Sequence, residues 1–397
     1  MRRYRIGSVF GIPIQLDLTF LLVLPLFAYL IGAQVEPVIE MLNTMGATLD
    51  VAALTDGFVP WLLGITAAVG LFVGVVLHEL GHSLVARRFG FPIESITLWL
   101  FGGIAQLTEM PEDWKQELWI SLAGPAVSFA LGALSYVAFT TLPADGGVAV
   151  AGATFVLGYL AILNVVLGVF NLLPGFPMDG GRVLRALLAR TRPYARATEL
   201  AAEVGKGFAI LLGLFGLFVT FNILLIGLAF FIYIAAESES RQTVMRVALE
   251  GVTVRDVMTP ADRVSTVRTD TSVQELIGVM FEERHTGYPV ERNGEIVGIV
   301  TLDDARAVRE VERDAYTVED VMTSELYGVS PDDDVMDALE DLDSEGVGRL
   351  FVFDDQDEFV GLLTRTDIMT ALSIIRSSDD FTPPGEEHEP TVLRPGA

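Results

Sequence analysis

Six long apolar runs fill most of the first 236 residues of this 397-residue chain and constrain its fold more than any other feature. An α-helix needs about 20 apolar residues to cross a bilayer. The runs lie at about 12–33, 59–86, 117–142, 148–171, 207–221 and 222–236. The last two are short and meet near Phe221, where we expect a hairpin of tilted helices, with one long buried helix as the alternative. The sequence therefore predicts an α-helical polytopic membrane domain over residues 1–240, with six transmembrane helices.

Arginines beside these runs predict how the helices cross the membrane, because positive residues concentrate on the cytoplasmic side. They cluster at the N-terminus and after the second and fourth runs, at Arg2, Arg3, Arg5, Arg87, Arg88, Arg182, Arg185, Arg190, Arg192 and Arg196. All clusters fall on one side of six alternating helices, which predicts a multi-pass protein of the cell membrane with both termini in the cytoplasm. We interpret these arginines as topology signals rather than catalytic groups. The basic start resembles a secretory signal, but no clear cleavage site follows, so we expect a retained first helix.

The part of the chain after Gly251 has a different composition. It contains 34 acidic residues and 12 arginines, which gives −22 of the net charge of −26. No stretch in it could span a bilayer. Because an acidic surface in a chain with only two lysines is typical of proteins from a salt-rich cytoplasm, we expect a halophilic source. A surface without a basic patch also argues against nucleic acid as a partner.

Two histidines and a glutamate lie within the second apolar run, where ionisable side chains are costly without a function. His78 and His82 are four residues apart, so on a helix they share one face, with Glu79 beside them. Such a pair can bind one Zn²⁺ while the glutamate acts as a base. The chain has no cysteine, so any further ligand must be a histidine or a carboxylate.

A candidate for the third ligand follows the fourth apolar run. Residues 171–182 contain two prolines and three glycines, which break a helix at the depth predicted for the histidines. Asp179 lies in this break and could complete a catalytic zinc site of three protein ligands. Aspartate before two glycines is also ordinary turn chemistry. Its occurrence together with two histidines at matching depth favours a ligand.

The motifs at residues 78–82 and 171–181 resemble those of the site-2 protease family of intramembrane zinc metalloproteases. The resemblance implies one Zn²⁺ per chain held by His78, His82 and Asp179, with Glu79 as the general base. It implies that Asn171 handles the substrate or the oxyanion. The implied activity is hydrolysis of peptide bonds within transmembrane segments of membrane-tethered proteins, such as anti-sigma factors. Four further matches to the family are expected to serve packing or the substrate strand, at Gly102, Gly103, Gly124 and Pro125.

Residues 91–107 do not continue the pattern of spanning helices. β-Branched residues alternate along this stretch and glycines interrupt it, which predicts strands at the membrane surface. The edge of such a β region could pair with an unwound substrate and hold its backbone extended. We treat this pairing as a hypothesis.

The acidic half contains an internal repeat. Residues 254–259 recur at 318–323, and residues 298–304 recur at 361–367, with a period of 63 to 64 residues. These segments resemble a tandem CBS domain pair, which predicts an α/β fold over 245–376 with repeats at about 252–312 and 316–376. The resemblance implies sites for AMP or ATP in the two repeats, at Thr301, Asp304, Thr364 and Asp367. Tyr288 is replaced by Leu350 in the second repeat, so a second adenine pocket stays open to question, as does a homodimer through the pair.

Residues 377–397 are rich in acidic residues and proline, which predicts a disordered acidic tail. Two other functions fit parts of the chain. A CBS-gated transporter or channel would also place ionisable residues in the membrane, but it does not need two histidines on one helical face opposite a carboxylate. An inactive scaffold would not need a complete set of ligands with Glu79 beside it. The sequence therefore favours a zinc metalloprotease that acts on a transmembrane substrate in the bilayer.

Overall fold

A computed structural model describes residues 3–99, 102–107, 113–143 and 146–377. The predicted disordered tail beyond Ser377 lies outside the described residues. The chain divides into two compact units, Met1–Thr243 and Val244–Ala397, and each is described by itself.

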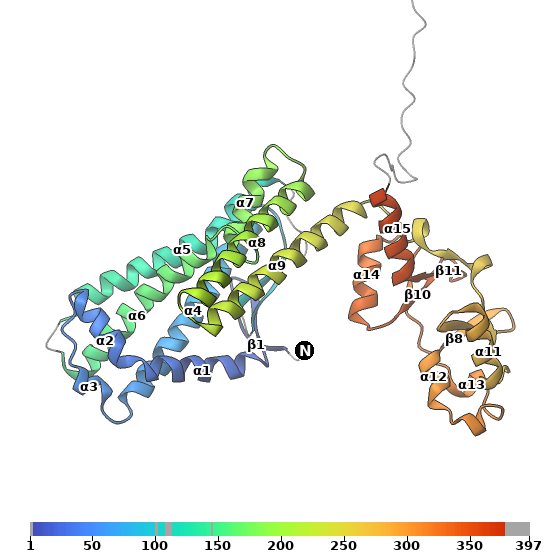
Figure 1. Cartoon of the computed structure of the whole chain (residues 1–397), viewed down its shortest axis with the longest axis horizontal. Helices are drawn as coiled ribbons and strands as arrows, with labels where there is room; N and C mark the ends of the chain where they lie inside the picture. Colours follow the sequence, from blue (N-terminus) through green and yellow to red (C-terminus); the bar gives the residue numbers. More distant parts are fainter. Residues whose placement is uncertain (1–2, 100–101, 108–112, 144–145, 378–397) are drawn as a thin grey trace, which may run out of the picture. The chain divides into compact units, whose positions relative to one another are not determined.

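The first unit is built from long apolar helices (Figure 1). Among the described residues, five helices are long and apolar enough to cross a membrane, namely α4 (Val59–Arg88), α5 (Trp114–Thr141), α6 (Gly147–Asn171), α8 (Tyr194–Phe218) and α9 (Ile223–Ala248). Only 17 to 33% of their most apolar windows is buried within the protein, so most of the apolar surface faces outward, as lipid contact requires. The predicted polytopic helical fold is confirmed.

The first predicted span is wrong as a single helix. Its start, residues Ile12–Asp17, forms strand β2, in which Ile12 and Ile14 are buried with the period of two of a strand. The helix that follows, α1 (Phe20–Ala33), has 14 residues, about 21 Å, which is short of the roughly 30 Å of a hydrocarbon core. A sixth span exists only if α1 and α2 (Val35–Thr44), bent by 62° at their junction, cross together. A short helix, α3 (Val51–Thr55), precedes α4.

The predicted hairpin of the last two helices is confirmed, since α8 and α9 are separated at Phe221, whose φ is 50°. The Asn222 side chain accepts hydrogen bonds from the N–H groups of Leu224 and Leu225 and so begins α9. Helix α8 begins at Tyr194, earlier than predicted, because small buried residues such as Ala201 and Gly205 let it pack closely on the segment before α7 (Asp179–Ala189).

A four-stranded sheet accompanies the helices of the first unit. Its order is β1 (Arg3–Val9), β2, β3 (Ile93–Trp99) and β4 (Gly102–Leu107), with β2 and β3 parallel and the other pairs antiparallel. The strands predicted within 91–107 are confirmed, whereas β1 and β2 were not predicted. In the described part of the chain β4 is the last strand of the sheet, so its outer edge is not paired.

The second unit contains two small sheets with helices packed on each, which confirms the predicted α/β CBS pair. One sheet has the order β5 (Thr259–Pro260), β11 (Phe359–Thr364), β10 (Arg349–Phe353) and β9 (Gly328–Val329). The other has the order β6 (Val267–Arg268), β7 (Gly287–Arg292) and β8 (Glu295–Thr301). The helices are α10 (Val254–Val257), α11 (Val273–Glu283), α12 (Leu302–Ala307), α13 (Val318–Val321), α14 (Val335–Ser344) and α15 (Arg365–Ser377).

The two repeats interlock at their first segments. Strand β5 belongs to the first repeat but pairs with β11 of the second, and Thr323 of the second repeat bridges Ile299 of the first. Met258 fills the space over Gly361, and Met322 fills the equivalent space over Gly298. The repeated motifs are therefore packing partners of each other across the pair.

Candidate metal centre

Helix α4 carries the two histidines near its C-terminal end. The Nε2 atoms of His78 and His82 are 3.2 Å apart, and both residues are buried. The spacing of four residues places both rings on the face of α4 that packs against α5.

Helix α5 orients both imidazole rings. Nδ1 of His82 donates a hydrogen bond of 2.7 Å to the Ile120 carbonyl, and Nδ1 of His78 lies 2.8 Å from the Ser128 hydroxyl. Because a carbonyl only accepts, the neutral His82 ring keeps its Nε2 lone pair free for a metal. Gly124 lies between these two contacts, and a Cβ there would overlap Nε2 of His82 and come within 2.6 Å of Nε2 of His78. The expected packing role of Gly124 is thus a role at the metal centre itself.

Asp179 is the first residue of α7 and reaches both histidines. Its Oδ2 is 3.1 Å from each Nε2 atom. A Cβ at Gly180 would overlap the carbonyls of Leu172 and Leu173, so glycine allows α7 to begin directly against the end of α6. The Asp-Gly-Gly segment is therefore a helix start rather than a free turn.

These three donor atoms suit a zinc ion. In a tetrahedral site with ligands about 2.0–2.1 Å from the metal, neighbouring ligand atoms lie about 3.3 Å apart. The observed separations are 3.1 to 3.2 Å. Among the described residues, these three side chains form the group that could hold a metal ion. Gly124 leaves space beside the two Nε2 atoms, which a Cβ at this position would fill.

Glu79 follows His78 on α4 and lies beside strand β4. A Cβ at Gly103 would come within 2.5 Å of Cγ of Glu79, so the backbone of the edge strand runs directly against this carboxylate side chain. The strand and the candidate base are therefore neighbours.

Asn171 is the last residue of α6. Its side-chain amide donates a hydrogen bond of 3.0 Å to the Leu167 carbonyl of the same helix. The expected role of Asn171 with the substrate or the oxyanion stays a prediction, because this hydrogen bond uses only one of its two amide hydrogens.

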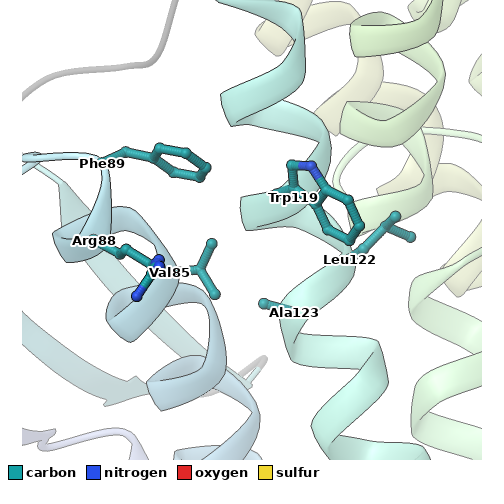
Figure 2. A pocket seen from close by; sticks show the side chains of 6 residues that line it. All are labelled: Val85, Arg88, Phe89, Trp119, Leu122 and Ala123. Atoms are coloured by element: carbon teal, nitrogen blue, oxygen red, sulfur yellow. The ribbon is translucent and has the colours of Figure 1, made fainter.

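An apolar recess lies near this centre, between the ends of α4 and α5 (Figure 2). It has a volume of about 380 Å³ and begins one helical turn beyond His82. Figure 2 shows the side chains of Val85 and Phe89 on one side, facing Trp119 and Ala123 on the other. The recess is apolar, so it offers no further ligand for a metal.

Sequence reasoning missed two residues around the centre. Ser128 follows Ile120 and Gly124 at intervals of four along α5, a pattern that marks one helical face and could have indicated it. Arg185 was interpreted only as a topology signal, but its side chain is 1% exposed and also forms ion pairs with Glu117 and Glu239.

The side chains predicted to bind a nucleotide are hydrogen-bonded to each other in pairs. Thr301 donates its hydroxyl to Asp304 Oδ2 at 2.6 Å, and Thr364 does the same to Asp367 at 2.6 Å. Each pair forms a capping box at the start of a helix, as do two further Thr-x-x-Asp pairs beginning at Thr253 and Thr317. The bonds from Thr317 lower the pKa of Asp320 below its ordinary value. Helix capping therefore accounts for part of the recurring Thr-x-x-Asp pattern.

Comparisons with known proteins agree with this architecture. The model of peptidase family M50 matches residues 66–145 and 141–212, and the CBS domain model matches residues 254–310 and 318–374. A zinc metalloprotease of Methanocaldococcus jannaschii is 35% identical over 95% of this chain and 98% of that protein. A homologue from Mycobacterium tuberculosis is 32% identical over 94% of this chain and 93% of that protein.

Among solved structures, the site-2 protease from Methanocaldococcus jannaschii is 36% identical, with a TM-score of 0.40, and the match covers 60% of this chain and 95% of that one. The full-length relatives are metalloproteases, which excludes the alternative that the membrane histidines belong to a CBS-gated transporter or channel. The chain therefore belongs to peptidase family M50 and is a membrane zinc metalloprotease of the site-2 protease type with a C-terminal CBS pair.

Proposed function

We propose that this protein hydrolyses peptide bonds within transmembrane segments of membrane-tethered proteins. One observation carries the proposal: His78, His82 and Asp179, from two helices far apart in sequence, bring three donor atoms to within 3.2 Å of one another. They do so in a unit whose long helices are apolar enough to lie in a bilayer. The substrate bond must therefore come to the centre inside or at the edge of the membrane.

The residues divide the chemistry as follows. His78, His82 and Asp179 would hold Zn²⁺, which when bound supplies Lewis acidity to a water molecule and to the scissile carbonyl. Glu79 takes a proton from the attacking water and returns it to the departing amine. Asn171, at the end of α6, has a second amide hydrogen besides the one donated to Leu167, and it would hold a carbonyl oxygen of the substrate.

Strand β4 offers a way to present the substrate. A peptide bond within a helix is shielded because its carbonyl is already hydrogen-bonded, so the segment must unwind first. An unwound segment paired with the outer edge of β4 would lie extended next to Glu79, which Gly103 of this strand already contacts. Strand pairing thus serves both unwinding and alignment.

The positive-inside rule supports a metal centre near the cytoplasmic face. Arg87 and Arg88 end α4 and are exposed, only a few residues after His82. Both termini and the CBS pair would then lie in the cytoplasm.

The CBS pair would regulate the protease by binding an adenine nucleotide. Thr301 and Asp304 lie where β8 passes into α12, and Thr364 and Asp367 lie at the equivalent junction of the second repeat. A carboxylate can accept from ribose hydroxyls, and a threonine hydroxyl can donate to a phosphate oxygen.

The metal site is tested by metal analysis of the purified protein and of two variants. We expect about one Zn²⁺ per chain, and its loss in His78→Ala and in Asp179→Ala. His285→Ala is the matched control, since this histidine lies in the second unit, and it should keep the metal. Glu79→Gln should keep zinc but lose cleavage of a transmembrane substrate. Proteolysis retained in Glu79→Gln would refute the proposed mechanism.

The nucleotide site is tested by separating ligand binding from helix capping. Calorimetric titration of the full chain with AMP or ATP should show binding that Thr301→Ala removes. Thr317→Ala is the control, because it breaks a capping box of the same type without altering the proposed site. If both variants lose nucleotide affinity equally, or if the unaltered chain releases no heat on titration, the Thr-x-x-Asp pairs only cap helices and the proposed nucleotide site is wrong.

A further inference from the structure

Arg185 is a fully buried cation on the same helix as the third candidate zinc ligand. It follows Asp179 by six residues along α7, about 9 Å of helix, and its side chain is 1% exposed. A buried charge is costly unless it is paired and hydrogen-bonded, so its surroundings are expected to be specific.

Two carboxylates from different helices hold the Arg185 guanidinium. Its Nε donates to Glu117 on α5 at 2.6 Å, and one terminal nitrogen donates to Glu239 on α9 at 2.9 Å. The guanidinium carbon also lies 4.9 Å from the ring centre of Tyr194 on α8 and 5.0 Å from that of Phe176. One side chain therefore joins α7 to α5, α8 and α9.

These contacts bracket Asp179 on both sides. Phe176 precedes Asp179 by three residues and packs with Ala201, Ala202 and Ala236, which belong to α8 and α9. Arg185 follows on the other side of the ligand. A shift of Phe176 or of Arg185 is therefore expected to move the start of α7. There, Asp179 Oδ2 lies 3.1 Å from Nε2 of both histidines.

Helix α9 connects this cluster with the second unit of the chain. The helix carries Glu239 and continues unbroken to Ala248. Met245 and Ala248, on its last turns, pack against the hydrophobic core of the second unit, which includes Leu249 and Val254. Met245 follows Glu239 by only six positions on the same helix.

We propose that Arg185 is a positioning residue for Asp179 and that Glu239 makes its position depend on helix α9. The inference rests on the zinc site proposed above. When α9 moves, the ion pair between Glu239 and Arg185 changes and α7 shifts. Asp179, at the start of α7, then moves away from the two histidines. Arg185 touches neither the donor atoms nor a substrate, so it acts only through Asp179.

The test compares two glutamates on α9 in the full chain. Glu239→Gln removes the partner of Arg185. Glu237→Gln is the matched control, because Glu237 lies two residues earlier and pairs with Lys206 of α8 and with Arg241, away from α7. The zinc dissociation constant is measured by competition with a chelator. The absorption spectrum of the Co²⁺-loaded protein reports the ligand geometry.

We expect Glu239→Gln to bind zinc about three- to tenfold more weakly, which is less than the 10- to 100-fold effect of removing a ligand's own partner because Glu239 acts on Asp179 only through Arg185, and to weaken the absorption of four-coordinate Co²⁺. Glu237→Gln should stay within about twofold of the unaltered chain. A merely structural role of the ion pair would lower thermal stability without changing the Co²⁺ spectrum, and that result would overturn the proposal. Equal effects in the two variants would overturn it as well.

Arg185 itself supplies a second measurement. Arg185→Gln should weaken zinc binding further than Glu239→Gln, and Arg185→Lys, which keeps the charge, should restore part of it. If neither variant folds, the comparison of Glu239 with Glu237 still decides. Zinc retained in His78→Ala would refute the proposed metal site, whereas unaltered zinc binding in Glu239→Gln with a metal-free His78→Ala would refute only the positioning role.

Discussion

At the scale of single residues, the metal centre depends on hydrogen bonds on the far side of each imidazole ring. Ile120 and Ser128 fix the two Nδ1 atoms, so that both Nε2 atoms face Asp179. A ring that lost this bond could rotate or take the other tautomer, and either change would remove a ligand lone pair from the centre.

Ser128→Ala is therefore expected to weaken zinc binding by about 10- to 100-fold, because His78 loses the Ser128 hydroxyl, which is its Nδ1 partner among the described residues. Chelator competition measures the effect. Ser83→Ala is the matched control, since Ser83 is also buried and its hydroxyl has no partner among the described residues. Equal zinc affinity in the two variants would show that α4 alone orients His78.

Local spacing explains which site residues the sequence could predict. His78, Glu79 and His82 lie on one helix, so the spacing of four residues is enough to place both rings on one face. Asp179 is about 100 residues away, and its matching membrane depth, together with the motif around it, indicated that it could reach them. Gly124 and Ser128 belong to α5, and which face of α5 meets α4 is a tertiary fact that the apolar pattern of a membrane helix does not encode.

At the scale of secondary-structure elements, the sheet edge beside Glu79 is the feature with the clearest consequence. The sequence predicted β3 and β4 from alternation of β-branched residues and glycine breaks. It missed β2 because Ile12–Asp17 begins an apolar run, and average hydropathy does not separate a buried strand from the start of a helix. Strand β2 is identified by its pairing with β3 in the folded structure, where Ile14 lies opposite Ile96.

Ile104→Pro tests the role of this edge. Proline has no backbone N–H and weakens the pairing of β4 with a neighbouring strand, so we expect cleavage of a transmembrane substrate to fall about five- to tenfold, the value of one hydrogen bond. Ile104→Ala is the control because it keeps the backbone donor. Zinc content should be unaltered in both. If Ile104→Pro cleaves every substrate as fast as Ile104→Ala, substrate pairing at β4 is excluded.

At the scale of the whole chain, two units of different character are joined by one helix. The apolar first unit and the acidic second unit could be separated from composition alone, and the period of 63 to 64 residues predicted the CBS pair. The interlocking of the repeats could not be predicted, because Met258 and Met322 meet their partners only in the folded pair. The link between α9 and Asp179 is likewise invisible in sequence, where Arg185 differs in no way from the neighbouring surface arginines.

A link of this kind has a thermodynamic signature, because coupling between two sites is reciprocal. If a nucleotide bound to the second unit changes the zinc affinity of the first by some factor, zinc must change the nucleotide affinity by the same factor. Coupling free energies of 1–3 kcal/mol correspond to factors of about 5 to 150. The two measurements are independent, so their agreement is a strict test.

We therefore expect AMP or ATP to bind the full chain with different affinity before and after zinc is removed by a chelator, by about fivefold or more. Calorimetric titration measures both states. Glu237→Gln should preserve the difference, whereas Glu239→Gln should reduce it to a factor of about one, because that variant cuts the contact between α9 and Arg185. If the nucleotide affinity of the unaltered chain is the same with and without zinc, the conformational states of the two units are not coupled through α9, and the prediction is wrong.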